Sequence, residues 1–396
     1  MSSQDYEALW ARFDTPIDRR GTASTKWDKY QAQPGVLPFW VADMDLPTPD
    51  FVLDAVRERL EHPVLGYTNV PATLIESFCG WLARRYEWQV DPEWLVWISG
   101  VVPGLEVAAR AVGTPGTPLF IPCPVYYPFL KVARHSGRRE VRTPLHRVRG
   151  ADIDRWEMDF EAMRTLVRTH PTATARALLL CNPQNPTGRR YRRDELARLA
   201  DLAIEENLVV ISDDIHCELL LDDGPHTPLA SLNDAIAART ISLFAPGKTY
   251  NLPGLSSAVA VIPDAQLRAR FQAARAGMVG SPGPLAYAAA EAAYGADDHW
   301  LEGLRAYLRR NRDAVAAVVG DRAAPVEATY LTWIDVSDLG LNQPASFFED
   351  HGLGLNDGSA FGGAGFVRFN FGCSSGQLET GLERLRTALA EAPPRE

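Results

Sequence analysis

The chain has 396 residues, of which 46% are hydrophobic, and a formal net charge of −10, so it can form more than one domain, and neither nucleic acid nor an anionic membrane is an expected partner. No uncharged apolar run reaches the roughly 18 residues of a membrane span, and residues 1–9 lack the basic and apolar regions of a signal peptide. The five cysteines form no C-x-x-C pair or disulfide framework, which predicts a cytoplasmic protein with reduced thiols.

The first two-thirds of the chain alternates amphipathic segments with short apolar runs. Apolar residues at helical spacing predict helices over Pro49–His62, Ala72–Tyr86 and Arg192–Asn207. The short runs, bounded by Gly, Pro or Asp, suit strands that are buried on both faces. Strands and helices in alternation indicate an α/β fold with a mostly parallel sheet. The predicted strands are Leu95–Ser99, Pro118–Pro122, Ala177–Cys181, Leu208–Ser212, Thr240–Phe244 and Ala258–Ile262.

The pattern changes after residue 280, which predicts a second, smaller α/β domain. Long helices are expected over His299–Val318 and Ser375–Glu391, with strands at Tyr330–Val336 and Gly365–Asn370 between them. We therefore predict a large domain over residues 48–285. The small domain would combine residues 1–47 and 286–396.

The triplet Gly247-Lys248-Thr249 resembles the end of a nucleotide-binding P-loop but lacks the rest of that motif. A P-loop has a glycine five residues before its second glycine, where this chain has Ser242 within a predicted strand. The chain has only three other lysines, Lys26, Lys29 and Lys131, and we expect these at the surface. Lys248 is therefore the candidate for a catalytic amine.

Ligands of open α/β sheets bind beyond the carboxyl ends of the strands, so the residues that follow each strand are informative. Free N–H groups at the start of a helix near Val101 and Val102 would bind a phosphate. Tyr126, Asn185 and Asp213 follow other strands. Together with Lys248 they offer an aromatic plate, an amide, a carboxylate and an amine, which is the set that pyridoxal 5′-phosphate (PLP) requires.

Each of these residues also has a structural interpretation. An Asp after a strand is often a helix cap, an Asn-Pro pair is often a turn, and Tyr126 with Tyr127 could pack in the core. His216 stands beside Asp213, Asp214 and Glu218 in a group that could bind a metal, but we do not predict one.

The stretch Asn182–Gly188 reads NPQNPTG, and it resembles the N-P-x-N-P-T-G signature of fold type I PLP enzymes, the class I/II aminotransferase superfamily. Within it, the chain resembles the MalY/PatB group of cystathionine β-lyases nearly end to end. Further matching stretches are Lys26–Asp28, Leu37–Asp45, Gly66–Tyr67, Ser212–His216, Thr329–Trp333 and Gly365–Asn370. The resemblance implies an aspartate-aminotransferase-like fold with a large, mostly parallel, seven-stranded-type sheet.

The resemblance also implies a role for each cofactor contact. Lys248 would be the Schiff-base lysine, Asp213 the partner of the pyridinium nitrogen and Asn185 the partner of the phenolic oxygen. Tyr126 would stack on the ring, and the backbone N–H groups of Val101 and Val102 would hold the phosphate.

Three further residues follow from the same resemblance. His216 would lie near the phenolic oxygen, where many aminotransferases have a tyrosine. Arg368 would hold the substrate α-carboxylate, or else form a structural ion pair. Tyr67 would reach the phosphate of a neighbouring subunit, which implies a homodimer.

The loop around Lys248 departs from the family pattern. Related enzymes carry serine hydroxyls just before the lysine, where this chain has Ala245 and Gly247, and many aminotransferases have an arginine at the position of Ser256. Phosphate binding would then depend more on the helix N-terminus, Thr249 and Tyr67. An altered cofactor affinity or substrate approach is expected.

The sequence thus predicts a PLP-dependent carbon–sulfur β-lyase that cleaves cystathionine or another S-substituted L-cysteine to a thiol, pyruvate and ammonia. Lys248 would be the general base, and Tyr126 would assist the leaving sulfur. An aminotransferase is the main alternative because it uses the same residues. A specialised biosynthetic enzyme for an S-conjugated cysteine and a PLP-binding regulator are further alternatives.

Overall fold

The computed structural model describes residues 6–172 and 175–392. Its centre is an eight-stranded sheet in the order β2-β9-β8-β7-β6-β3-β4-β5. The strands from β8 to β4 run parallel to their neighbours, whereas β9 is antiparallel to both β2 and β8, and β5 is antiparallel to β4. Their bounds are β2 Leu95–Ile98, β3 Pro118–Cys123, β4 Arg139–Arg149, β5 Asp154–Met158, β6 Arg176–Cys181, β7 Leu208–Asp213, β8 Thr240–Phe244 and β9 Ala258–Val261.

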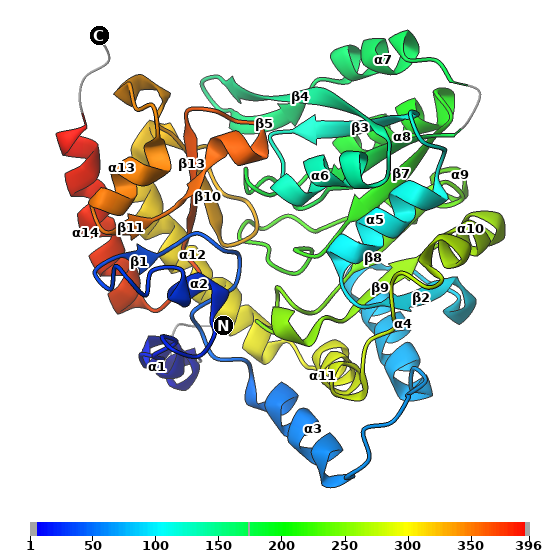
Figure 1. The fold of residues 1–396 in the computed structure, drawn as a ribbon, viewed down its shortest axis with the longest axis horizontal. Coiled ribbons are helices and arrows are strands. Elements are labelled where there is room, and N and C mark those ends of the chain that lie inside the picture. The colour runs from blue at the N-terminus through cyan, green and yellow to red at the C-terminus, as the bar shows by residue number, and fades with distance from the viewer. Residues whose placement is uncertain (1–5, 173–174, 393–396) are drawn as a thin grey trace.

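Helices cover both faces of this sheet, which explains why its middle strands are apolar throughout (Figure 1). In β6, Ala177 and Leu179 pack into one core, while Leu178 and Leu180 pack into another. The first core is closed by α5 Val101–Ala111, α6 Tyr127–His135 and α10 Ala265–Arg275, and the second by α7 Phe160–Thr169, α8 Arg193–Glu205 and α9 Asp234–Ala237.

The N-terminal and C-terminal parts of the chain lie together at one side of this layered body (Figure 1). A three-stranded antiparallel sheet, β10-β13-β12, forms there, and β1 pairs with β11. One apolar core joins these strands to the helices around them. The elements are α1 Glu7–Asp14, α2 Thr25–Asp28, β1 Leu37–Pro38, α12 His299–Val319, β10 Leu331–Asp335, α13 Pro344–Asp350, β11 Leu353–Gly354, β12 Asn356–Asp357, β13 Phe366–Asn370 and α14 Ser375–Glu391.

Three more helices connect the two regions. They are α3 Asp50–Glu61, α4 Ala72–Tyr86 and α11 Pro284–Gly295. The α3 helix and the loop from α3 to α4 project from the bottom of the view in Figure 1. The predicted division at residues 47 and 285 falls beside these helices, and it stays a prediction.

Every helix and strand predicted from periodicity is present, with ends within two residues of the prediction. The six strands predicted for this sheet do not include β4 and β5, which form an antiparallel pair at its edge, so the sheet has eight strands where the resemblance implied a seven-stranded type. Most side chains of β4 are polar and exposed, with Val141 and Leu145 as its buried apolar residues. An edge strand of this kind lacks the continuous apolar run that marks a buried strand.

The expectation that Lys26 lies at the surface is wrong, because its side chain is 1% exposed. Its ammonium lies 2.8 Å from a carboxylate oxygen of Asp45 and 3.1 Å from the backbone oxygen of Asp43. Arg19 binds the carboxylates of Asp43 and Asp45, each at 2.6 Å. This buried charge network ties α2 to residues 40–45, whose backbone lies against the site described below. Lys29 and Lys131 are exposed or half-exposed, as expected.

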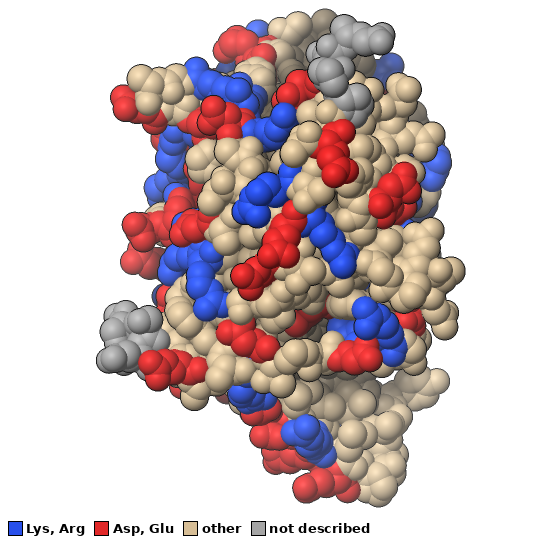
Figure 2. Space-filling view, turned by 90° about the vertical axis from the view of Figure 1, so that its left-hand side faces the viewer, with Lys and Arg blue, Asp and Glu red and all other residues tan. Residues whose placement is uncertain are grey.

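Acidic and basic side chains are interspersed on the face that carries the C-terminal helix (Figure 2), so that face has no continuous basic surface. Within residues 6–172 and 175–392, no helix combines the length and the apolar character needed to cross a membrane. The first five residues of the predicted polar N-terminus lie outside the described part of the chain.

Candidate active site

A cavity of about 330 Å³ opens at the carboxyl ends of the parallel strands. Its size is within the range of small-molecule sites. All the predicted site residues line it except Tyr67 and Arg368. The predicted residues that line it are Val101, Val102, Tyr126, Asn185, Asp213, His216 and Lys248.

Lys248 lies in the loop after β8, where its ammonium donates a hydrogen bond to the backbone oxygen of Ala42. Burial lowers the pKa of Lys248 to about 8, while the negative charges of Asp43 and Asp213 partly oppose this shift. A sizeable fraction of the amine is therefore neutral near pH 7, and a neutral amine can act as a nucleophile or a base.

Asp213 is the last residue of β7, the strand next to β8. One oxygen of its carboxylate accepts a hydrogen bond of 3.1 Å from the backbone N–H of Ile215. Burial raises the pKa of Asp213 to about 7, and the nearby Asp214 adds to this shift. A cationic partner beside this buried carboxyl would lower its pKa and favour its ionised form.

The neighbouring acidic residues point elsewhere. Asp214 accepts a hydrogen bond of 2.9 Å from Nε2 of His226, and Glu218 accepts one of 2.9 Å from the Trp81 indole. Among the residues that the structure describes, no cluster of three or more His, Cys, Asp or Glu side chains could hold a metal. His216 is buried at the cavity, and burial keeps its pKa well below the usual value, so its ring is neutral.

Arg368 lies behind the cavity on β13 and is 1% exposed. One guanidinium nitrogen donates to Oδ1 of Asn185 at 2.8 Å, and the other donates to the backbone oxygen of Trp40 and to Oδ1 of Asn356, both at 2.7 Å. Burial lowers the pKa of Arg368 to about 10, which still leaves it cationic at neutral pH. Because Oδ1 of Asn185 is occupied by Arg368, the amide nitrogen of Asn185 remains available to another acceptor.

Tyr126 precedes α6 and joins two of the loops at the cavity. Its backbone N–H donates to the backbone oxygen of Asn185 at 2.8 Å, and its ring contacts that of Tyr127 with centroids 5.0 Å apart. Burial raises the pKa of the Tyr126 hydroxyl to about 12, so it is protonated at neutral pH. Tyr67, in contrast, lies fully exposed in the loop between α3 and α4 and does not line the cavity of its own chain.

One end of the cavity is formed by the first turn of α5. Gly100 precedes this helix with a φ of 122°, a backbone conformation that favours glycine. The first N–H groups of a helix lack acceptors within the helix, so those of Val101 and Val102 are available to an anion. Ala245 and Gly247 line the same cavity without offering a hydroxyl.

The sequence analysis assigned no site role to three serines that line this cavity, Ser99, Ser256 and Ser257. Only residues that follow strands were considered, on the assumption that the strands are parallel. Because β9 is antiparallel to both its neighbours, its beginning lies at the same rim as the ends of β2 and β8. The residues just before β9, Ser256 and Ser257, therefore join the site. The short apolar sequence of β9 does not indicate the direction in which this strand runs in the sheet.

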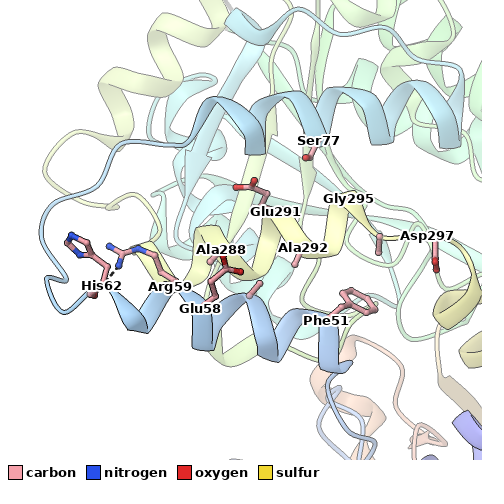
Figure 3. Close-up of a pocket in the computed structure, with 12 residues that line it drawn as sticks. Phe51, Glu58, Arg59, His62, Ser77, Ala288, Glu291, Ala292, Gly295 and Asp297 are labelled. Atoms are coloured by element: carbon pink, nitrogen blue, oxygen red, sulfur yellow. Dashed lines mark hydrogen bonds between the residues drawn. The ribbon is translucent and has the colours of Figure 1, made fainter.

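A larger groove of about 960 Å³ lies between α3, α4 and α11 (Figure 3). Alanines of α3 and α11 line part of it. Glu291 also comes from α11, and Ser77 comes from α4. Glu58, Arg59 and Asp297 add charges of both signs. None of the predicted catalytic residues lies in this groove, so the smaller cavity is the candidate active site.

Comparison with known proteins shows the family. Residues 35–385 match the model of the aminotransferase class I and II family. Cystathionine beta-lyase PatB of Bacillus subtilis is 37% identical over 393 residues, covering 96% of this chain and 100% of that protein. The chain therefore belongs to the aminotransferase class I and II family.

Two solved structures share the whole fold. The crystal structure of OvoB is 40% identical, with a TM-score of 0.90 over 96% of this chain and 99% of its own. Cystalysin from Treponema denticola, which contains a pyridoxal 5′-phosphate cofactor, is 31% identical, with a TM-score of 0.89 over 96% of this chain and 98% of its own. The predicted fold class is thus confirmed.

The residues present in the cavity fit pyridoxal 5′-phosphate. An amine whose pKa is lowered to about 8 follows β8, and a carboxyl whose pKa is raised to about 7 ends the adjacent strand β7. Nδ1 of His216 and Oγ of Ser257 are buried at the cavity without a hydrogen-bond partner. An aromatic aldehyde with a ring nitrogen, a phenolic oxygen and a phosphate would supply partners for these groups.

We expect Asp213→Asn to stabilise the cofactor-free protein at neutral pH. The pKa of Asp213 is about 7 in the folded chain and 3.8 ordinarily, so unfolding releases a proton between these values and the wild type loses stability as pH rises through this range. The asparagine does not titrate. The difference in unfolding free energy should therefore grow from pH 5 to pH 7 and reach on the order of 1–3 kcal/mol.

Urea unfolding of both proteins at several pH values measures this difference. Asp223→Asn, at an exposed loop position, is the matched control and should show the pH dependence of the wild type. An equal stability difference at pH 5 and pH 7 would contradict the assigned electrostatics of Asp213.

Proposed function

We propose that this chain is a PLP-dependent carbon–sulfur β-lyase that converts cystathionine or another S-substituted L-cysteine to a thiol, pyruvate and ammonia. The observation that carries the proposal is the placement of Lys248 and Asp213 on adjacent strands at one cavity, with their pKa values shifted to about 8 and about 7. The similarity to PatB over 96% of the chain supports the lyase reaction over the other reactions of the family.

The cavity residues would hold the cofactor from several sides. Nζ of Lys248 would bind the aldehyde carbon covalently, and Asp213 would pair with the protonated ring nitrogen. The amide nitrogen of Asn185 would donate to the phenolic oxygen, with the neutral ring of His216 beside it. The ring of Tyr126 would cover one face of the cofactor.

The phosphate would lie at the first turn of α5. The N–H groups of Val101 and Val102 point out of this turn, and the partial positive charge of the helix N-terminus favours a dianion there. Thr249, which is 1% exposed, follows the lysine in the same loop.

The chemistry that PLP supplies when bound is an electron-accepting ring that stabilises negative charge on the α-carbon of an amino acid. With an amino-acid substrate in the cavity, Nζ of Lys248 would act as general base and take the proton from Cα. Its lowered pKa of about 8 makes it an efficient base near neutral pH. The Cβ–S bond would then break, and the sulfur would leave with the bonding electron pair. Water would hydrolyse the remaining three-carbon amine to pyruvate and ammonia.

Two other side chains would act on the substrate. The guanidinium of Arg368 would bind the α-carboxylate as a two-pronged donor, since its Nε has no partner in the structure. The Tyr126 hydroxyl, protonated because its pKa is about 12, would donate a proton to the departing sulfur. An aminotransferase would use the same groups but keep the Cβ substituent.

The site would be completed by a second copy of the chain. The segment that carries Tyr67 projects from the body of the protein and exposes Leu60, Val64 and Leu65, each at least 49% accessible. Exposed apolar side chains in one segment favour a protein partner. In the proposed homodimer, Tyr67 of each chain reaches the phosphate end of the other chain's cavity. All five cysteines are free thiols, which fits the predicted cytoplasmic location.

The lyase reaction predicts turnover without a second substrate. Incubation of the purified protein with L-cystathionine, in the absence of any keto acid, should give pyruvate, ammonia and a free thiol in equal amounts. Lys248→Ala should lower kcat by roughly 10³-fold or more, because the base is lost. Lys131→Ala, an exposed lysine on α6, is the control and should keep wild-type turnover.

The products are measured with lactate dehydrogenase for pyruvate and a thiol reagent for sulfur. Turnover that begins only after a keto acid is added would instead identify an aminotransferase. Full activity of Lys248→Ala would refute the role of this lysine.

Arg368→Ala should mainly weaken substrate binding. Loss of a charge-assisted hydrogen-bond pair to the α-carboxylate should raise KM roughly 10- to 100-fold, with a smaller change in kcat. Arg164→Ala removes an arginine from a surface ion pair with Glu205 and should leave KM unchanged. Steady-state kinetics on both variants decides the point, and an unaltered KM in Arg368→Ala would remove its proposed role.

Complementation tests whether Tyr67 acts across a dimer. Tyr67→Phe and Lys248→Ala should each be impaired alone, but a one-to-one mixture after subunit exchange should recover about a quarter of the wild-type sites. In a mixed dimer, one site has both Lys248 from its own chain and Tyr67 from the partner. No recovery in a mixture shown to contain mixed dimers would place Tyr67 outside the neighbouring site.

A further inference from the structure

The cavity lacks hydroxyl donors on the lysine side of its phosphate end. Ala245 and Gly247 line it there, and neither side chain carries a hydroxyl. The turn Pro253–Leu255 packs beside Gly247. A Cβ atom on Gly247 would lie 3.4 Å from Cα of Pro253, which is van der Waals contact.

The same turn leads directly to a buried hydroxyl. Ser256 follows it with a φ of 45°, a left-handed conformation that is uncommon for a serine. Ser257 comes next and is 6% exposed, lines the cavity, and has no hydrogen-bond partner for its Oγ. A buried hydroxyl without a partner is destabilising. The cost is recovered when an acceptor enters the cavity.

Strand register places Ser257 beside the start of α5. Ala258 pairs with Ile98 in the antiparallel ladder of β9 and β2, so Ser257 lies opposite Ser99, one residue before Gly100. On the other side, Val259 pairs with Phe244, which puts the start of β9 next to the loop of Lys248. Ser257 thus lies between the helix N-terminus and the lysine loop.

We propose that the Ser257 hydroxyl donates a hydrogen bond to the phosphate of the bound cofactor and replaces the donors that Ala245 and Gly247 lack. This inference rests on the proposed PLP-dependent function. The N–H groups of Val101 and Val102 and the Ser257 hydroxyl would then bind different oxygens of one phosphate. The hydroxyl comes from a strand of the central sheet, after the lysine in the chain.

The test compares two ligands that differ only in the phosphate. Cofactor is removed from the purified holoenzyme, and the dissociation constants of pyridoxal 5′-phosphate and of pyridoxal are measured by fluorescence titration. In Ser257→Ala, the constant for pyridoxal 5′-phosphate should rise roughly 10-fold or more, because a hydrogen bond to a charged group is lost. The constant for pyridoxal should stay within about twofold of the wild-type value.

Ser242→Ala is the matched control. Oγ of Ser242 is also buried and unpartnered, but it lies within β8 and does not line the cavity. This variant should bind both ligands as the wild type does, and unfolding curves should show that both variants fold.

Two outcomes would overturn the inference while leaving the proposed function in place. One is a Ser257→Ala protein that binds pyridoxal 5′-phosphate as tightly as the wild type does. The other is an equal loss of affinity for both ligands, since the phosphate would then not be the group involved. A wild-type protein that binds neither ligand would refute the proposed function itself.

Discussion

The site depends on one electrostatic constraint, which is that a carboxyl and an amine are buried at the ends of two adjacent parallel strands. Asp213 ends β7 and Lys248 follows β8, and both lose most of their hydration. Burial disfavours the charged form of each group, so the pKa of the acid rises and that of the amine falls. A ligand that brings a cation to Asp213 and an electrophile to Lys248 relieves both costs. The same burial that shifts these two pKa values therefore makes the cavity selective for such a ligand.

The two ends of the chain complete this cavity through backbone oxygens. Residues 40–43 run across it, where Trp40 accepts from Arg368 and Ala42 accepts from Lys248. The buried ion pair of Lys26 and Asp45 holds this segment in place behind the cavity. In the proposed function, residues that follow strands of the central sheet would hold the cofactor, while Arg368 on β13 would hold the substrate. Catalytic geometry requires both regions to be packed together.

Sequence patterns predicted most of the fold and many residues that line the cavity, because buried strands are apolar throughout and polar residues that follow parallel strands gather at one rim. They failed where the pattern depends on long-range pairing. The polar edge strands β4 and β5 have no such pattern, and the reversed direction of β9 concealed Ser257. Lys26 was misplaced because a buried lysine is recognised only through its partners. The role of Tyr67 depends on a second chain.

The proposed position of the phosphate donors affects how freely the loop of Lys248 can move. In related enzymes that carry serines just before the lysine, the segment that holds the phosphate also carries the base. In the arrangement proposed here, Ser257 and the first turn of α5 hold the phosphate from β9 and the helix. In the proposed reaction, Nζ of Lys248 would have to move between the positions of the cofactor and of the substrate Cα in each cycle. With Ala245 and Gly247 before it, the lysine loop would make fewer phosphate contacts, so a shift of the base would disturb the orientation of the ring toward Asp213 less.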